Sequence, residues 1–151
     1  AAAVRLDPPR ATVVPVVFVP SAPVATVTAR GVLPASVPHG DAAVNAGRTA
    51  LLVALLSGKI DPDPELLLIA TEDRLHQPYR AATMPGSYAL VEDLRASGVP
   101  AVISGAGPTV LAFTDRDSAA KIAGRAPGDF RAYVLEIDQN GAVETRLSSR
   151  E

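Results

Sequence analysis

The sequence predicts an α+β domain, a ferredoxin-like sandwich with helices on one face of a mainly antiparallel sheet. The first observation behind this fold class is the order of the expected elements: strand, helices, strand–turn–strand, helix, strand, strand. The second is composition. Hydrophobic residues make up 48% and charged residues 20% of the 151 residues, which is typical of a globular chain long enough to bury a core.

Charge, cysteine content and hydropathy exclude several classes of function. The chain has 14 Lys and Arg against 16 Asp and Glu, and a net charge of −2 is poorly suited to binding nucleic acid. The absence of Cys excludes disulfides, thiolate metal sites and Cys nucleophiles, and His39 and His76 lie too far apart to predict a metal site. No apolar stretch is long enough to cross a bilayer and there is no secretory signal, so we expect a cytoplasmic protein without a membrane partner.

The first expected element is a strand at 11–19, where the residues are β-branched and nearly all apolar. Pro15 lies inside this run and has no N–H to donate to a ladder, so we expect an edge strand or a bulge. Residues 20–38 are punctuated by Pro and Gly, which predicts a loop. We expect this loop to hold a short helical or extended insert that carries Thr26 and Arg30.

Two helices are expected next. Asp41 is placed to cap the first, whose apolar residues follow at helical spacing until Gly58. The sequence Asp-Pro-Glu at 63–65 marks the second start, with a capping side chain, a proline at the first helical position and an acid in the first turn. That helix is expected to continue through 66–75 until Pro78 bends or ends it.

A third helix is expected to begin near Ser87 and to end at Gly98, with Leu90, Val91 and Leu94 on one buried face. The remaining expected elements are a strand at 101–104, a glycine turn, a strand at 109–113, a helix capped within 114–117 and ending near 124–127, a strand at 131–137, and a hairpin turn at Asn140-Gly141 into 142–147.

The glycine turn Ser104-Gly-Ala-Gly-Pro-Thr109 is the first candidate for chemistry. Gly105 and Gly107 lack a Cβ, so they can adopt positive φ and leave backbone amides free to approach an anionic oxygen or a carboxylate. The alternative is a tight β-turn that needs glycine only for its geometry. The spacing is not that of a dinucleotide-binding loop, which has a third glycine opening a helix.

Two arginines are the second candidates. Arg30 precedes Leu33-Pro34, and Arg80 ends the segment 72–80. A planar guanidinium can hold a carboxylate through two parallel hydrogen bonds, so two of them converging on one pocket would select an amino or hydroxy acid. The alternative is that each lies on the surface or pairs with a nearby acid.

Other polar residues predict no catalytic group in this chain. The acid pairs Glu72-Asp73, Glu92-Asp93 and Asp115/Asp117 are interpreted as solvated faces and caps, because neighbouring helical residues point in different directions. His76 could act as a base, but no Ser or Asp lies at a spacing that indicates a catalytic triad. Asn45 either faces solvent or donates to a neighbouring loop.

Five segments then occur in one order along the chain. They are Leu33-Pro34, Asn45-x-x-Arg48, Glu72-Asp73-x-Leu75-His76-Gln-Pro78-Tyr-Arg80, Met84-Pro85-Gly86 and Ser104-Gly-Ala-Gly-Pro-Thr109. This series resembles the C-terminal half of homoserine kinases, within the GHMP family of small-molecule kinases, over residues 16–147. The glycine motif is common to that family, whereas Pro-Tyr-Arg and Thr-x-x-x-Arg-x-x-Leu-Pro point more narrowly to homoserine kinases.

The resemblance implies a two-domain kinase whose C-terminal domain is a ferredoxin-like sandwich. Residues 11–151 would form this substrate-side domain, and 1–10 would be a remnant of, or linker from, the N-terminal domain. Such kinases transfer the γ-phosphoryl of ATP, with Mg²⁺, to the hydroxyl of L-homoserine in threonine biosynthesis. By similarity the substrate-binding residues are Thr26, Arg30, Arg80, Gly105 and Ala106, and the residues that shape the glycine loop are Ser104 and Gly107.

The family's ATP-binding loop and the acid near Mg²⁺ are not found in this sequence, since both belong to the N-terminal domain. We therefore expect this polypeptide alone to be inactive and to need that domain as its partner; a homodimer is also compatible. Two other hypotheses stay open. One is a GHMP kinase that acts on another small alcohol. The other is a non-catalytic ferredoxin-like domain that binds an amino acid or serves in assembly.

Overall fold

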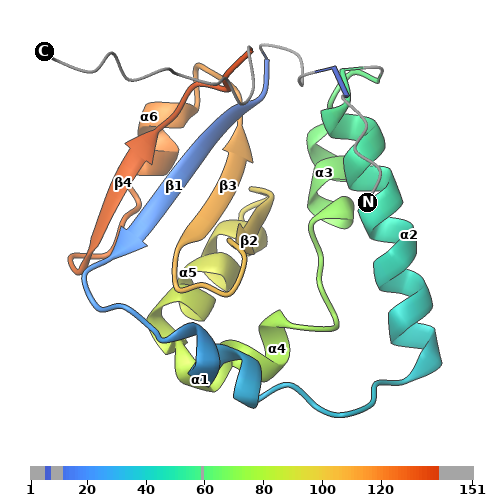
Figure 1. Ribbon diagram of the computed structural model, residues 1–151. Helices are drawn as coiled ribbons and strands as arrows, with labels where there is room; N and C mark the ends of the chain where they lie inside the picture. The colour runs from blue at the N-terminus through green and yellow to red at the C-terminus, as the bar shows by residue number, and fades with distance from the viewer. Residues whose placement is uncertain (1–5, 8–11, 59, 140–151) are drawn as a thin grey trace, which may run out of the picture.

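The computed structural model describes residues 6–7, 12–58 and 60–139, and in this part of the chain a four-stranded antiparallel sheet carries the fold (Figure 1). The strands lie in the order β2-β3-β1-β4. Their bounds are β1 Val14–Pro20, β2 Ala101–Ile103, β3 Val110–Thr114 and β4 Phe130–Val134. The helices are α1 Thr26–Gly31, α2 His39–Leu56, α3 Pro64–Ala70, α4 Gln77–Arg80, η1 Ala81–Thr83, α5 Pro85–Ala96 and α6 Ala119–Ala123. The predicted α+β fold class is confirmed.

The first strand, β1, lies inside the sheet, so the prediction of an edge strand or bulge at Pro15 was wrong. Val16 pairs with Ala112 of β3 on one side and with Val134 of β4 on the other. Pro15 is tolerated because its nitrogen faces the position where β4 ends. The amide of Leu135 donates to the Pro15 carbonyl at 2.9 Å. The reciprocal hydrogen bond would need an N–H on Pro15, which proline lacks, and this missing bond falls just after Val134, where β4 ends.

Helices α5 and α6 cover one face of the sheet (Figure 1). Helix α5 packs against β2 and β3, and α6 packs against β1 and β4. Leu90, Val91 and Leu94 of α5 are buried in this main cluster, as predicted, together with Val16 and Phe18 of β1. Burial of such side chains is worth roughly 1.5–3 kcal/mol each, so this layer supplies most of the stability of the domain.

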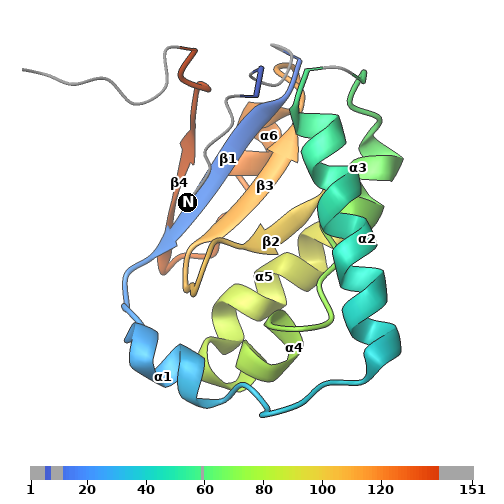
Figure 2. The same cartoon turned by 45° about the vertical axis from the view of Figure 1, so that its right-hand side comes forward.

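Helices α2 and α3 lie side by side next to β2 and β3 (Figure 2). They enclose a second cluster that comprises Val13, Leu55, Leu67, Ala70 and Phe113. Leu111 and Phe113 alternate along β3 with residues of the main cluster, so they point to the opposite face of the sheet. Leu55 is the one fully buried residue among the 18 of α2, so that helix is attached mainly by its C-terminal part.

The sequence predicts the cap of α3 correctly, but it is wrong about the cap of α2 and the end of α3. Asp63 caps α3 as predicted and accepts a hydrogen bond from the Glu65 amide at 2.8 Å. Asp41 is not a cap, because α2 begins at His39 and places Asp41 inside the first turn. Helix α3 ends at Ala70, and Pro78 lies in the first turn of the separate helix α4 rather than ending a longer one.

The insert in the first loop is helical, since α1 carries Thr26 and Arg30. The predicted hairpin at Asn140-Gly141 lies outside the described residues. In the described part of the chain, no helix has the length and apolar character needed to cross a membrane.

Candidate functional site

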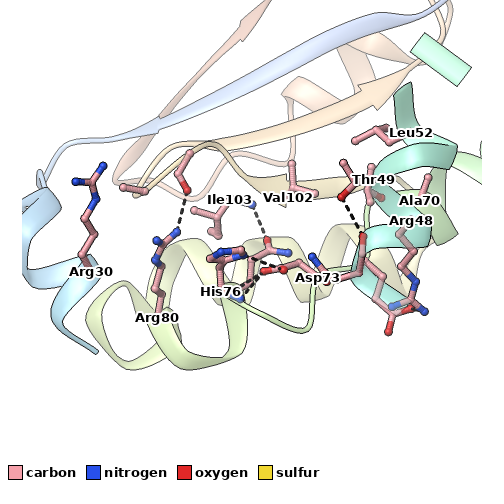
Figure 3. Close-up of a pocket in the computed structure, with 16 residues that line it drawn as sticks. Arg30, Arg48, Thr49, Leu52, Ala70, Asp73, His76, Arg80, Val102 and Ile103 are labelled. Atoms are coloured by element: carbon pink, nitrogen blue, oxygen red, sulfur yellow. Dashed lines mark hydrogen bonds and ion pairs between the residues drawn. The ribbon is translucent and has the colours of Figure 1, made fainter. Parts of the chain in front are cut away.

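A cavity of about 500 Å³ opens between α1, α2, α4 and the end of β2 (Figure 3). Arg30 reaches it from α1, Arg48 from α2, and Arg80 from α4. Gly105 and Ala106 of the glycine turn complete this lining. Segments that are distant in the sequence therefore meet at one concave surface, which is the usual form of a small-molecule site.

The glycine turn joins β2 to β3 and is closed by the Ser104 amide, which donates to the Thr109 carbonyl at 2.8 Å. Gly105 has a φ of 60° and Gly107 a φ of 83°, which is backbone that L side chains rarely adopt. Gly107 is also crowded, because a Cβ there would lie 2.5 Å from Met84 Sδ. Glycine is thus required by both conformation and packing.

Arg80 is buried at the centre of the site. Its Nε donates to the Ala29 carbonyl at 3.0 Å and its Nη1 donates to the Gly105 carbonyl at 3.0 Å. One guanidinium therefore fastens α1 and the glycine turn to α4. The N–H groups of the fork that these two bonds leave unused remain available to an acceptor in the cavity.

Arg30 lines the same cavity from α1, and in Figure 3 its side chain and that of Arg80 extend from neighbouring helices toward the sheet. Its side chain is exposed and has no hydrogen-bond or ion-pair partner among the residues that the structure describes. Thr26 lies one turn before Arg30 on α1, but it is exposed and does not line the cavity. The structure thus brings together four of the five predicted binding residues.

Asp73 organises the segment that leads into α4. Its carboxylate accepts hydrogen bonds from the amides of Leu75 at 3.0 Å, His76 at 2.9 Å and Gln77 at 2.6 Å. Burial raises the pKa of this carboxyl, but the amide bonds from Gln77 and Leu75 and the contact with His76 outweigh burial, so the pKa lies below its ordinary value of 3.8. Asp73 is therefore a charged cap, as interpreted from the sequence.

The remaining polar residues of the cavity hold one another in place. His76 Nδ1 lies 3.2 Å from Asp73 Oδ1 and its side chain is half exposed. Asn45 Oδ1 accepts a hydrogen bond from the Arg74 amide at 2.8 Å, so Asn45 does contact a neighbouring loop, but as an acceptor. Within the described ranges, no group of three or more His, Asp or Glu side chains is placed to hold a metal ion.

Two residues that sequence reasoning did not single out also fix the glycine turn. Gln77 Oε1 accepts a hydrogen bond from the Ile103 amide at 2.6 Å, and Ser87 Oγ donates to the Pro108 carbonyl at 2.5 Å. Both side chains are buried. The signal that could have marked them is a polar side chain in the first turn of a helix that starts with proline nearby, since Gln77 precedes Pro78 and Ser87 follows Pro85-Gly86.

A family model described as GHMP kinases C terminal matches residues 51–132. The chain is 58% identical to the homoserine kinase of Streptomyces coelicolor over 149 residues, which is 99% of this chain and 47% of that protein. It is 61% identical to the homoserine kinase of Streptomyces avermitilis, with the same shares covered.

A solved structure is similar in fold. The crystal structure of homoserine kinase from Cytophaga hutchinsonii has a TM-score of 0.78 and 26% sequence identity, over 90% of this chain and 45% of that one. The chain thus spans about half the length of the relatives it matches.

Proposed function

The chain belongs to the GHMP kinase family, through the C-terminal domain of that family, and from this premise we propose that it forms the substrate-side domain of a homoserine kinase. The relatives named above carry that activity in their names and match almost the whole of this chain. The observation that carries the proposal is the meeting of Arg30 and Arg80 beside the glycine turn at one cavity.

The geometry suits a small zwitterion with a hydroxyl arm. Arg30 is free to turn toward a carboxylate, and Arg80 offers the N–H groups that its two backbone bonds leave unused. Each hydrogen bond between a guanidinium and a carboxylate contributes roughly 1.5–3 kcal/mol, so two arginines would fix both the position and the direction of the substrate. Holding the carboxylate sets the direction of the hydroxyl, and phosphoryl transfer depends mainly on alignment and charge stabilisation.

The glycine turn would close over the substrate. Gly105 and Ala106 line the cavity, and without side chains of any length their backbone can approach a bound molecule closely. Thr26, which stands one helical turn from Arg30, would reach the substrate only if α1 moved toward the cavity, so its proposed role depends on closure of that helix.

ATP and Mg²⁺ are proposed to bind mainly outside this chain. Among the described residues no cluster of acids or histidines fits a metal ion, and the glycine turn connects two strands, whereas a phosphate-binding loop opens a helix. The isolated chain is accordingly proposed to be inactive until it is joined to an N-terminal domain.

The test is an ADP-release assay on the full-length protein that carries this chain, with L-homoserine, L-serine and mevalonate offered in parallel. We expect release with homoserine, and none from the isolated chain. Arg30→Lys should raise the homoserine KM with the ATP KM unchanged, because an ammonium cannot hold a carboxylate through two parallel bonds. Arg116→Lys, at an exposed arginine outside the cavity, is the matched control.

Activity with mevalonate in place of homoserine would favour another member of the family. Absence of release with every alcohol, together with binding of homoserine to the protein, would favour a non-catalytic amino-acid-binding domain. A change of the ATP KM in Arg30→Lys would contradict the role proposed for that residue.

A further inference from the structure

Gln77 occupies an unusual place at the free edge of the sheet. Among the strands of the described residues, β2 is an outer one, and no described strand lies on one side of its backbone. Ile103, its last residue, pairs with Val110 of β3 on the inner side. On the outer side, the Ile103 amide donates to Gln77 Oε1 at 2.6 Å, and both residues are buried. The side chain of Gln77 therefore does what a further strand would do, because it satisfies a buried amide.

The hydrogen bond lies directly before the glycine turn. Ile103 is followed by Ser104, where the turn begins. Gln77 holds the chain at this entry, and Arg80 holds it two residues later through the Gly105 carbonyl. The two side chains are three positions apart on α4, so they project from the same side of that helix. Helix α4 thus grips the turn at two points.

The start of helix α4 is also held in place. The Gln77 amide donates to Asp73 at 2.6 Å, so the helix that carries Gln77 is held by the carboxylate before it. Gln77 lines the cavity, but its side-chain oxygen is engaged with backbone, so this oxygen is not a contact to the substrate in the proposed function. Its contact acts on the distance between the turn and the fork of Arg80.

We propose that Gln77 is a positioning residue that sets the glycine turn at the correct distance from the Arg80 guanidinium. The inference rests on the proposed function for its kinetic consequence, but not for its structural one. Without the Gln77 bond, α4 holds the turn through Arg80 alone, and the entry of the turn at Ile103 can shift away from α4. A small displacement of a substrate-binding group is enough to lower the fraction of productively aligned substrate.

The experiment compares Gln77→Met with Gln77→Glu in the full-length protein. Methionine has a similar length but cannot accept the Ile103 hydrogen bond, whereas glutamate retains an acceptor oxygen. We expect Gln77→Met to raise the homoserine KM about tenfold, the effect of losing one buried hydrogen bond, with the ATP KM unchanged. Gln77→Glu should restore the bond to Ile103 and the position of the turn, but its negative charge opposes a carboxylate in the same cavity, so we expect it to recover only part of the rise in KM. Gln139→Met, at an exposed glutamine, is the matched control.

A second measurement reads the turn itself. With selective ¹⁵N-labelling of Ile and Gly, Gln77→Met should speed hydrogen exchange at the Ile103 amide and move the Gly105 and Gly107 resonances, and Gln77→Glu should reverse both changes. This measurement holds whatever the substrate is. If the parent protein does not phosphorylate homoserine, the proposed function fails, and the Gly105 and Gly107 resonances still decide the positioning role.

Two outcomes would overturn the inference. One is faster exchange at Ile103 with unmoved glycine resonances and unchanged kinetics, which would show that the bond does not place the turn. The other is an equal rise of both KM values with no recovery in Gln77→Glu, which would indicate general loss of structure.

Discussion

The two helices that carry the arginines of the cavity are held in very different ways. Helix α4 is capped by Asp73, buries Gln77 and Arg80, and makes three side-chain hydrogen bonds to the chain around it. Helix α1 has no side-chain cap, and Ala29 is its single buried residue. Its remaining residues are exposed, with Val27 at 83%.

This difference indicates that one half of the proposed site is preformed and the other half is only loosely attached. The half on α4 and the glycine turn is built in advance, because hydrogen bonds from Arg80 and to Gln77 already hold the turn, while the remaining N–H groups of Arg80 stay available to a ligand. The half on α1 is attached to α4 through the Ala29 carbonyl, and a ligand or a further domain would be needed to cover its exposed residues. Low local burial is typical of elements that move when a ligand binds, so α1 is the part expected to close.

The largest effect should come from Arg80→Met, which removes the hydrogen bonds that connect α4 to α1 and to the glycine turn. It leaves the buried Ala29 carbonyl and the part-buried Gly105 carbonyl without their charged donor, and we expect a loss of about 4 kcal/mol in the free energy of unfolding, at ~1.5–3 kcal/mol for each such bond. Urea unfolding followed by circular dichroism measures it. Arg30→Met is the matched control and should change stability by less than about 0.5 kcal/mol. Equal losses in the two variants would remove the contrast between the helices.

The next effect should come from Gly107→Ala in the preformed half. The new Cβ meets Met84 Sδ at 2.5 Å and the residue must keep a φ of 83°, so we expect a loss of about 3 kcal/mol from left-handed strain and overpacking together. Gly98→Ala is the matched control, because Gly98 has a φ of 80° with no atom within 4 Å of a Cβ. It should cost only about 1 kcal/mol, which is the conformational part. Similar losses at the two sites would show that the turn is not packed as tightly as we infer.

The smallest effect should come from Asp73→Asn, which weakens the cap of α4. An amide has one acceptor oxygen in place of two, and we expect a loss of about 1 kcal/mol at neutral pH, typical of a weakened helix cap. Because folding lowers the pKa of Asp73, the stabilisation is complete above 3.8 and is lost as the pH falls from 3.8 through the lower folded-state pKa. Urea unfolding at pH 7 and pH 3 should therefore give a smaller difference between parent and variant at pH 3. The exposed Asp117→Asn serves as control, and a difference that grows on acidification would contradict the assigned shift.

The fold could be predicted from the sequence where one local signal decided the outcome. The cap and proline at 63–65 fixed a helix start, and the apolar spacing of Leu90, Val91 and Leu94 fixed a buried face. The position of Pro15 could not be predicted, because it depends on where β4 ends. Nothing local to Pro15 carries that information.

The site followed the same rule. The arginines and the glycine turn were identified as residue types suited to a carboxylate, and the resemblance to a known family supplied their convergence. The hydrogen bonds of Gln77 and Ser87 were missed because each is made to a single backbone group of a distant segment. Such pairings are set by tertiary packing, and composition and periodicity do not encode them.

The strand order β2-β3-β1-β4 has a consequence for how this chain acquires its structure. The first described strand, β1, is flanked on both sides, and both of its partners come much later in the sequence, because Val16 pairs with Ala112 and with Val134. Pairing such distant strands requires closing very long loops, and the entropy of loop closure is lost before the strand contacts form, which slows folding. On a ribosome, the sheet cannot be completed until β4 has been synthesised. A chain that ends before β4 would leave one edge of β1 unpaired, and an unpaired edge promotes aggregation.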